Sequence, residues 1–172
     1  MNDHELAAAL AAEAGRLLLD VRTEFADAPS EERKAAGDMR SHDFLIEQLV
    51  AARPDDAVLS EEGADDLIRL RSDRVWIVDP LDGTREFADP GRADWAVHVA
   101  LWSGGELIAG AVALPARGVT LATPQVPPLP AAPAVPRIVV SRTRPPAVAL
   151  RVRAALGATL VEMGSAGAKV AA

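Results

Sequence analysis

The chain has 172 residues, of which 49% are apolar, a formal net charge of −7 and no cysteine. This length suits one domain, or one domain and part of a second, and the apolar fraction predicts a packed core. The negative charge argues against a nucleic-acid polymer as partner, and the lack of cysteine excludes disulfides, thiolate zinc sites and a cysteine nucleophile.

The first residues, "MNDHELAAALAAEAG", have no basic region, and acidic residues interrupt the alanines. A signal peptide is therefore not expected. No run approaches about eighteen uncharged apolar residues, so no membrane span is expected either. The default expectation is a cytoplasmic protein without a membrane partner.

Two amphipathic helices are predicted next. Asp3 is expected to cap the first, which runs to about Phe25. The polar residues 27–37 predict a loop. The second helix is expected to begin near Asp38, whose simplest role is then that of an N-cap, and to end before Pro54.

Short apolar runs then predict the strands of a sheet. The runs are residues 57–60, 74–79, 95–102, 107–114 and 118–123, with a short helix expected at 64–72. The segment "SGGE" (103–106) predicts a hairpin between two of them. Helices followed by an antiparallel-rich sheet indicate an α+β fold.

Residues 123–136 contain six prolines and predict a semi-rigid linker. We therefore expect an N-terminal α+β domain at 1–122 and the start of a C-terminal α/β domain at 137–172. The latter segment reads as strand, helix, strand and then the first turn of another helix. One such unit would leave two open sheet edges, so this second domain is expected to be incomplete.

Acidic residues cluster at the ends of predicted elements. Glu61 follows one strand, and Asp79 and Asp82 follow another in "WIVDPLDGTREF". Two carboxylates so close resist joint burial without a cation, and hard oxygen ligands suit Mg²⁺. Gly83 and Thr84 then offer turn amides for a phosphate.

This combination predicts metal-assisted phosphoryl hydrolysis, in which Thr84 and Asp38 orient and deprotonate the attacking water. Simpler interpretations exist for each piece. "DPLDG" alone is also typical of a turn, and "SEEG" alone of a helix start or loop. Arg85 could meet substrate charge or simply be exposed, and the three histidines are interpreted as surface or packing residues.

Together the motifs resemble the inositol monophosphatase-like family of Mg²⁺-dependent, lithium-sensitive phosphatases. "VLSEE" is similar to the family's first acidic motif, and "WIVDPLDGT" to its signature, with matching spacing from Asp38 through Glu61 to Asp79. The resemblance implies a layered α-β-α-β sandwich and two or three Mg²⁺ ions. "DGTREF" and "DWAVHVALW" look most like the CysQ branch of 3'(2'),5'-bisphosphate nucleotidases.

The resemblance also implies roles for individual residues. Those implied to bind metal are Glu61, Asp79, the carbonyl of Leu81, and Asp82; those implied to activate water are Asp38 and Thr84; those implied to bind substrate are Gly83, Thr84 and Arg85. The implied reaction removes the 3'-phosphate of adenosine 3',5'-bisphosphate in sulfate assimilation. The alternatives are inositol 1-phosphate or fructose 1,6-bisphosphate as substrate.

Two features depart from the family pattern. No lysine is placed cleanly before the first acidic motif, and no "W-D-x-A" motif, whose aspartate completes the metal site, follows "GSAGAK". A third alternative is therefore an inactive remnant, and we expect the 172 residues alone to be poorly stable with little phosphatase activity. A homodimer is also considered.

Overall fold

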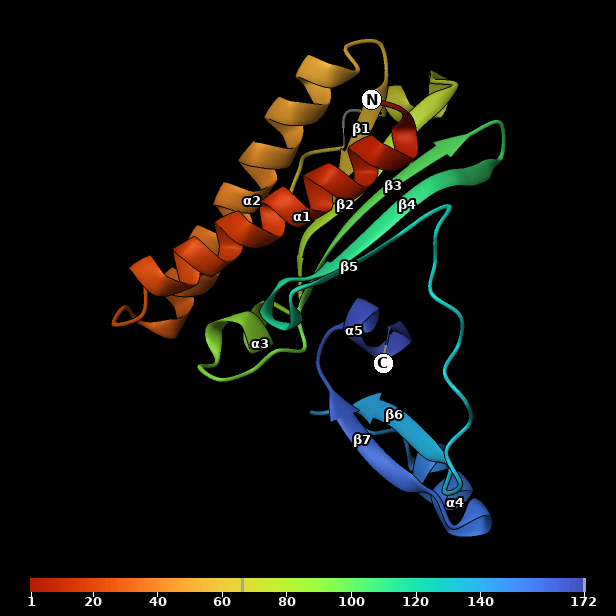
Figure 1. The fold of residues 1–172 in the computed structure, drawn as a ribbon. Helices are drawn as coiled ribbons and strands as arrows, with labels where there is room; N and C mark the ends of the chain where they lie inside the picture. The colour runs from red at the N-terminus through yellow and green to blue at the C-terminus, as the bar shows by residue number, and fades with distance from the viewer. Residues whose placement is uncertain (66, 172) are drawn as a thin grey trace.

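Two long helices cover one face of a five-stranded sheet in the computed structural model, which describes residues 1–65 and 67–171 (Figure 1). The helices are α1 (Asp3–Glu24) and α2 (Ser30–Ala52). Helix α1 packs on β3 and β4, and α2 packs on β2. No helix in the described ranges is both long and apolar enough to cross a membrane.

Helix α1 begins one residue earlier than expected, because Asn2 is its cap and Asp3 is not. The Asn2 side chain accepts a hydrogen bond from the Glu5 amide at 2.9 Å, and the Glu5 carboxylate accepts one from the Asn2 amide at 2.9 Å. This reciprocal capping box satisfies two otherwise unpaired donors. Asp3 is left to bind arginines elsewhere.

The predicted loop at 27–37 is wrong from residue 30 onward, because α2 already begins at Ser30. The polar sequence was misleading since Arg33 points inward and is buried. Its guanidinium donates to the backbone carbonyls of Phe25, Ala26, Ala28 and Ala88. Asp38 consequently lies within the helix and is not an N-cap.

The sheet has the order β1-β2-β3-β4-β5. The strands are β1 (Ala57–Ser60), β2 (Arg74–Asp82), β3 (Ala96–Ser103), β4 (Glu106–Leu114) and β5 (Val119–Ala122). Strands β1 and β2 are parallel, and the other neighbours are antiparallel, so the α+β prediction is confirmed. The helix expected at 64–72 is only a 3₁₀ turn, Ile68–Arg71, and a second such turn is Pro115–Arg117.

The core lies between the two helices and the sheet. Its largest fully buried side chains include Trp76, Trp95 and Phe87. The ring of Phe87 meets that of Trp95 edge to face at 5.2 Å between centroids, a favoured geometry. This packing fixes the end of β2 and the short helix α3 (Thr84–Ala88) that follows it.

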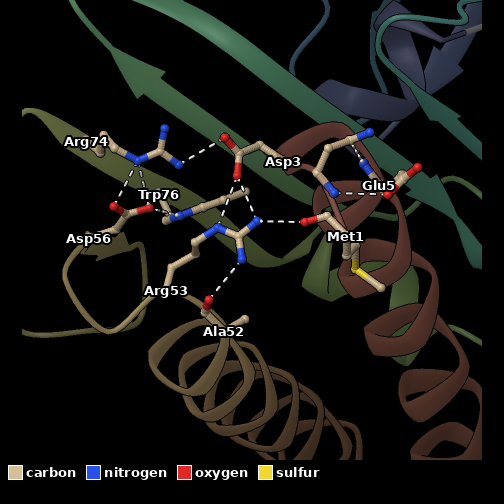
Figure 2. A network of polar contacts seen from close by, with 9 residues as sticks. Met1, Asp3, Glu5, Ala52, Arg53, Asp56, Arg74 and Trp76 are labelled. Atoms are coloured by element: carbon tan, nitrogen blue, oxygen red, sulfur yellow. Dashed lines mark hydrogen bonds and ion pairs between the residues drawn. The ribbon is translucent and has the colours of Figure 1, made fainter.

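A polar network closes the opposite end of this layer (Figure 2). Asp3 accepts hydrogen bonds from Arg53 and Arg74, and Asp56 accepts from Arg74 and from the indole of Trp76 at 2.8 Å. The network therefore joins the start of α1, the end of α2, the residue before β1 and the start of β2. Charge-assisted bonds of this kind are shorter and stronger than neutral ones.

The rest of the chain forms a separate, smaller sheet. Residues 123–136 contain neither helix nor strand and run along the outside of the molecule to β6 (Figure 1). The elements beyond are β6 (Arg137–Ser141), α4 (Ala147–Leu156), β7 (Thr159–Met163) and α5 (Ala166–Val170). Strands β6 and β7 are parallel, as the predicted strand-helix-strand unit requires, and α5 turns back toward the first sheet.

Candidate metal and phosphate site

Three strands bring acidic and imidazole groups to one place. Strand β2 carries Asp79 and Asp82 at its end, with an irregular register between them. Parallel pairing of Ser60 with Val78 sets Glu61 beside the same strand end, where its amide donates to the Val78 carbonyl at 3.3 Å. Antiparallel pairing places His98 of β3 opposite Asp79.

Asp79, Asp82 and His98 form a candidate metal-binding group. One ligand atom from each lies within 4.8 Å of the others. All three side chains are partly buried, and the Leu81 amide donates to Asp79 Oδ1 at 3.1 Å. Carboxylate oxygens of this kind fit a hard divalent cation.

Asp79 lies in an environment that disfavours its charge. Burial raises its pKa first, and the carboxylates of Glu61 and Asp82 add to the effect, so that the pKa reaches about 7. This is the like-charge repulsion that the sequence motif suggests. A bound cation would remove the penalty, which is an electrostatic reason for a metal here.

Asp82 behaves in the opposite way because it is surrounded by donors. Burial alone would raise its pKa, but hydrogen bonds from His98, the Gly167 amide and the Ser165 hydroxyl outweigh burial and hold the pKa well below its usual range. Oδ2 receives Ser165 and Gly167 at 2.7 Å each, and Oδ1 receives the Ala166 amide at 3.1 Å. Residues 164–167 at the start of α5, here called the α5 turn, thus bind a carboxylate of the first sheet.

The two residues expected to activate water also lie together. The Thr84 hydroxyl is 3.4 Å from Asp38 Oδ1 and 3.2 Å from the Leu81 carbonyl. Burial, followed by the charge of Glu62, raises the pKa of Asp38 to about 6. Asp38 is placed by the middle of α2 and Thr84 by the start of α3.

Two of the predicted substrate residues differ in their surroundings, since Gly83 is packed against Ser165 whereas Arg85 is exposed. Gly83 has φ +89°, which favours glycine, and an added Cβ would lie 3.0 Å from that of Ser165. This close approach explains why a glycine precedes Thr84. Arg85 is exposed on α3, and its role in substrate binding stays a prediction.

Sequence reasoning missed the part of the site that His98 and the α5 turn supply. His98 was interpreted as a surface or packing residue, whereas its Nε2 lies 3.0 Å from Asp82 Oδ2. That hydrogen bond, together with the charges of Asp82, Asp79 and Glu61, raises the pKa of His98. The available signal was a single histidine inside the apolar strand "AVHVAL", paired with the strand that carries the motif.

Two further contacts attach the smaller sheet beside this site. Arg142 donates to the buried carboxylate of Glu86 at 2.6 Å, and the Gly164 amide donates to Asp94 at 2.8 Å. Asp94 is also paired with Arg92. The loop and turn that follow β6 and β7 therefore contact α3 and the loop after it.

This fold and site define a class of protein. Residues 2–126, more than half of the chain, match the model of the inositol monophosphatase family. The chain belongs to that family.

Particular relatives narrow the comparison. A 3'-phosphoadenosine 5'-phosphate phosphatase of Mycobacterium bovis is 55% identical over 169 residues, covering 93% of this chain and 63% of the relative. The protein of that name in Mycobacterium leprae is 48% identical over 185 residues, covering 100% of this chain and 68% of the relative. The chain thus spans about two thirds of the length of these curated relatives.

Solved structures confirm the fold. An inositol monophosphatase from Staphylococcus aureus aligns with a TM-score of 0.78 at 22% identity, covering 99% of this chain and 69% of that one. SuhB of Mycobacterium tuberculosis aligns with a TM-score of 0.66 at 23% identity, covering 94% of this chain and 69% of that one. The layered sandwich expected from the sequence is therefore present.

Proposed function

We propose that the chain is a Mg²⁺-dependent phosphoric monoester hydrolase that removes the 3'-phosphate of adenosine 3',5'-bisphosphate. The observation that carries the proposal is the convergence of Asp79, Asp82 and Glu61 beside the Thr84–Asp38 pair. The names of the mycobacterial relatives support this substrate. A cytoplasmic location, a homodimer and the boundaries 1–122, 123–136 and 137–172 stay predictions from the sequence.

In this proposal Glu61, Asp79, Asp82 and the Leu81 carbonyl hold two or three Mg²⁺ ions. Bound ions of this type lower the pKa of water and stabilise a leaving oxygen. The side chains of the protein orient the attacking water and accept its proton. Thr84 orients a water molecule by its hydroxyl, and Asp38, ionised above its pKa of about 6, accepts the proton of that water.

Phosphate binding is assigned to the turn at Gly83 and Thr84. The left-handed conformation of Gly83 opens the backbone just before α3. Amide groups at such turns bind phosphate oxygens. Arg85, exposed at the same turn, is proposed to meet a second anionic group of the substrate.

The test is phosphate release from adenosine 3',5'-bisphosphate, inositol 1-phosphate and fructose 1,6-bisphosphate, with Mg²⁺ and with added Li⁺. The proposal expects release from the first substrate, dependence on Mg²⁺ and inhibition by Li⁺. The rate should be low, because little activity is expected of the 172 residues alone. Thr84→Ala should lower the rate at least about tenfold, since positioned acid–base groups contribute about 10²–10⁴-fold. Thr120→Ala is the matched control and should keep the rate, because the Thr120 side chain is exposed on β5.

Two outcomes of this assay would contradict the proposal. Faster phosphate release from inositol 1-phosphate than from adenosine 3',5'-bisphosphate would identify the chain as an inositol-type phosphatase. No release from any substrate, beside an active full-length mycobacterial relative, would identify a remnant without activity.

A further inference from the structure

The ligand set proposed above contains only oxygen atoms, yet a nitrogen lies among them. His98 Nε2 is 3.0 Å from Asp82 Oδ2, and it lies with one oxygen each of Asp79 and Asp82 inside a group spanning no more than 4.8 Å. The 3.0 Å between His98 Nε2 and Asp82 Oδ2 is the separation of two neighbouring ligands in one coordination sphere. With metal–ligand distances of about 2.1 Å, neighbouring ligands of an octahedral ion lie about 3 Å apart and opposite ones about 4.2 Å apart.

The imidazole is also held firmly in this position. Strand register places His98 opposite Asp79, which sets the start of its side chain. Gly167 of α5 packs against the ring, where an added Cβ would be 2.2 Å from Cε1 and 2.4 Å from Nε2. A ring held by its strand and by Gly167 keeps its orientation without further ordering, as metal-binding histidines generally do.

We propose that His98 Nε2 is a direct metal ligand, so that one position of the cluster is a mixed nitrogen–oxygen site that takes Mn²⁺ in preference to Mg²⁺. Imidazole favours first-row transition ions, whereas Mg²⁺ favours oxygen ligands only. The inference deepens the proposed metal-dependent function and rests on it for the remaining ligands. The competing role for His98 is that of a positioning residue that only hydrogen-bonds Asp82.

Pulsed electron paramagnetic resonance of the Mn²⁺-loaded chain separates these two roles. A directly bound imidazole produces nitrogen modulation of the Mn²⁺ signal, and incorporation of ¹⁵N-histidine changes its frequency. We expect this modulation in the wild type. His98→Asn should abolish it and weaken Mn²⁺ binding by at least about tenfold, while Mg²⁺ binding changes less.

His4→Asn is the matched control, because His4 is also a part-buried histidine with one hydrogen bond, 2.8 Å from Nδ1 to Thr123, but it lies on α1. This variant should keep both the modulation and the Mn²⁺ affinity. The labelled wild-type spectrum decides the question even where His98→Asn fails to fold.

Three results would overturn the inference: no Mn²⁺ binding, bound Mn²⁺ without histidine modulation, or modulation that persists in folded His98→Asn. The outcome is independent of turnover. Phosphate release without histidine modulation removes only the nitrogen ligand, and histidine modulation without phosphate release removes only the proposed reaction.

Discussion

At the scale of single residues, Asp82 combines two roles. It belongs to the candidate metal group, and it accepts hydrogen bonds from His98, Ser165 and two amides of the α5 turn. A carboxylate can accept at both oxygens, whereas an amide can accept at only one. Replacement of Asp82 by asparagine should therefore affect both metal binding and the attachment of α5.

Asp82→Asn is expected to destabilise the metal-free chain by about 1–3 kcal/mol, since buried donors lose their acceptor. It should also abolish most of the rise in melting temperature that Mg²⁺ produces in the wild type. The measurement is thermal unfolding with EDTA and with Mg²⁺. An unchanged Mg²⁺-dependent rise in the variant would remove Asp82 from the ligand set.

The partly buried Asp38 predicts a pH dependence of stability. Its pKa is raised from 3.8 to about 6, so its neutral form is favoured in the fold and stability is full below about pH 4. That contribution is lost as pH rises through about 6. Asp38→Asn should remove this loss and be more stable than the wild type at pH 7 without metal, by roughly 1 kcal/mol after solvent screening.

Chemical denaturation at pH 4 and pH 7, in EDTA, checks this sign. Asp43→Asn is the control, because Asp43 is exposed on the same helix. A wild type that gains stability relative to Asp38→Asn between these pH values would show that Asp38 is not held in a charge-disfavouring environment.

At the scale of elements, the α5 turn fits against α3 only because it contains glycine at position 164. A Cβ on Gly164 would lie 1.8 Å from Glu86 Cδ, and Glu86 is buried and bound to Arg142. The turn therefore cannot keep its place with a side chain there. This steric requirement cannot be predicted from the local sequence, because it depends on a contact with a residue of another element.

Gly164→Ala is expected to separate the α5 turn from α3 and to cost about 1–3 kcal/mol, the range of core overpacking. Hydrogen exchange of the amides of Gly164, Ala166 and Gly167 should become faster. Gly110→Ala is the control, since an added Cβ there has its nearest contact at 4.0 Å. Equal exchange in both variants would show that the turn tolerates the change.

At the scale of the whole molecule, the two sheets differ in how well they are covered. Helices α1 and α2 bury one face of the larger sheet, where Val97 and Val99 are fully buried. In the described ranges β6 and β7 pair only with each other. Helix α4 exposes a set of large apolar side chains, namely Val148, Leu150, Val152 and Leu156.

We expect the smaller sheet to open more easily than the larger one, because few buried apolar contacts mean low local stability. Native-state hydrogen exchange should show amides of β6 and β7 exchanging at least about tenfold faster than those of β3. The two sheets, measured in the same molecule, serve as each other's control. Equal protection would indicate that the whole chain unfolds as a single unit.

The sequence by itself determined the order of the strands and longer helices, the α+β class and the motif that carries Asp79, Asp82 and Thr84. These follow from local patterns, since apolar periodicity and turn residues act over a few positions. The sequence did not predict the short helix α3. The start of α2 was beyond such reasoning, because Arg33 is buried and one of its partners, the Ala88 carbonyl, lies 55 residues away in the chain. Its polarity therefore resembled that of a loop.

Only the tertiary structure decided which distant groups meet at the site. The approach of His98 and the α5 turn to Asp82 depends on strand register and on contacts 16 and 83–85 residues apart. The spacing of residues within one helix or strand cannot predict such contacts. The environment that raises the pKa of Asp79 and lowers that of Asp82 is likewise set by burial and neighbours, which exist only once the chain is folded.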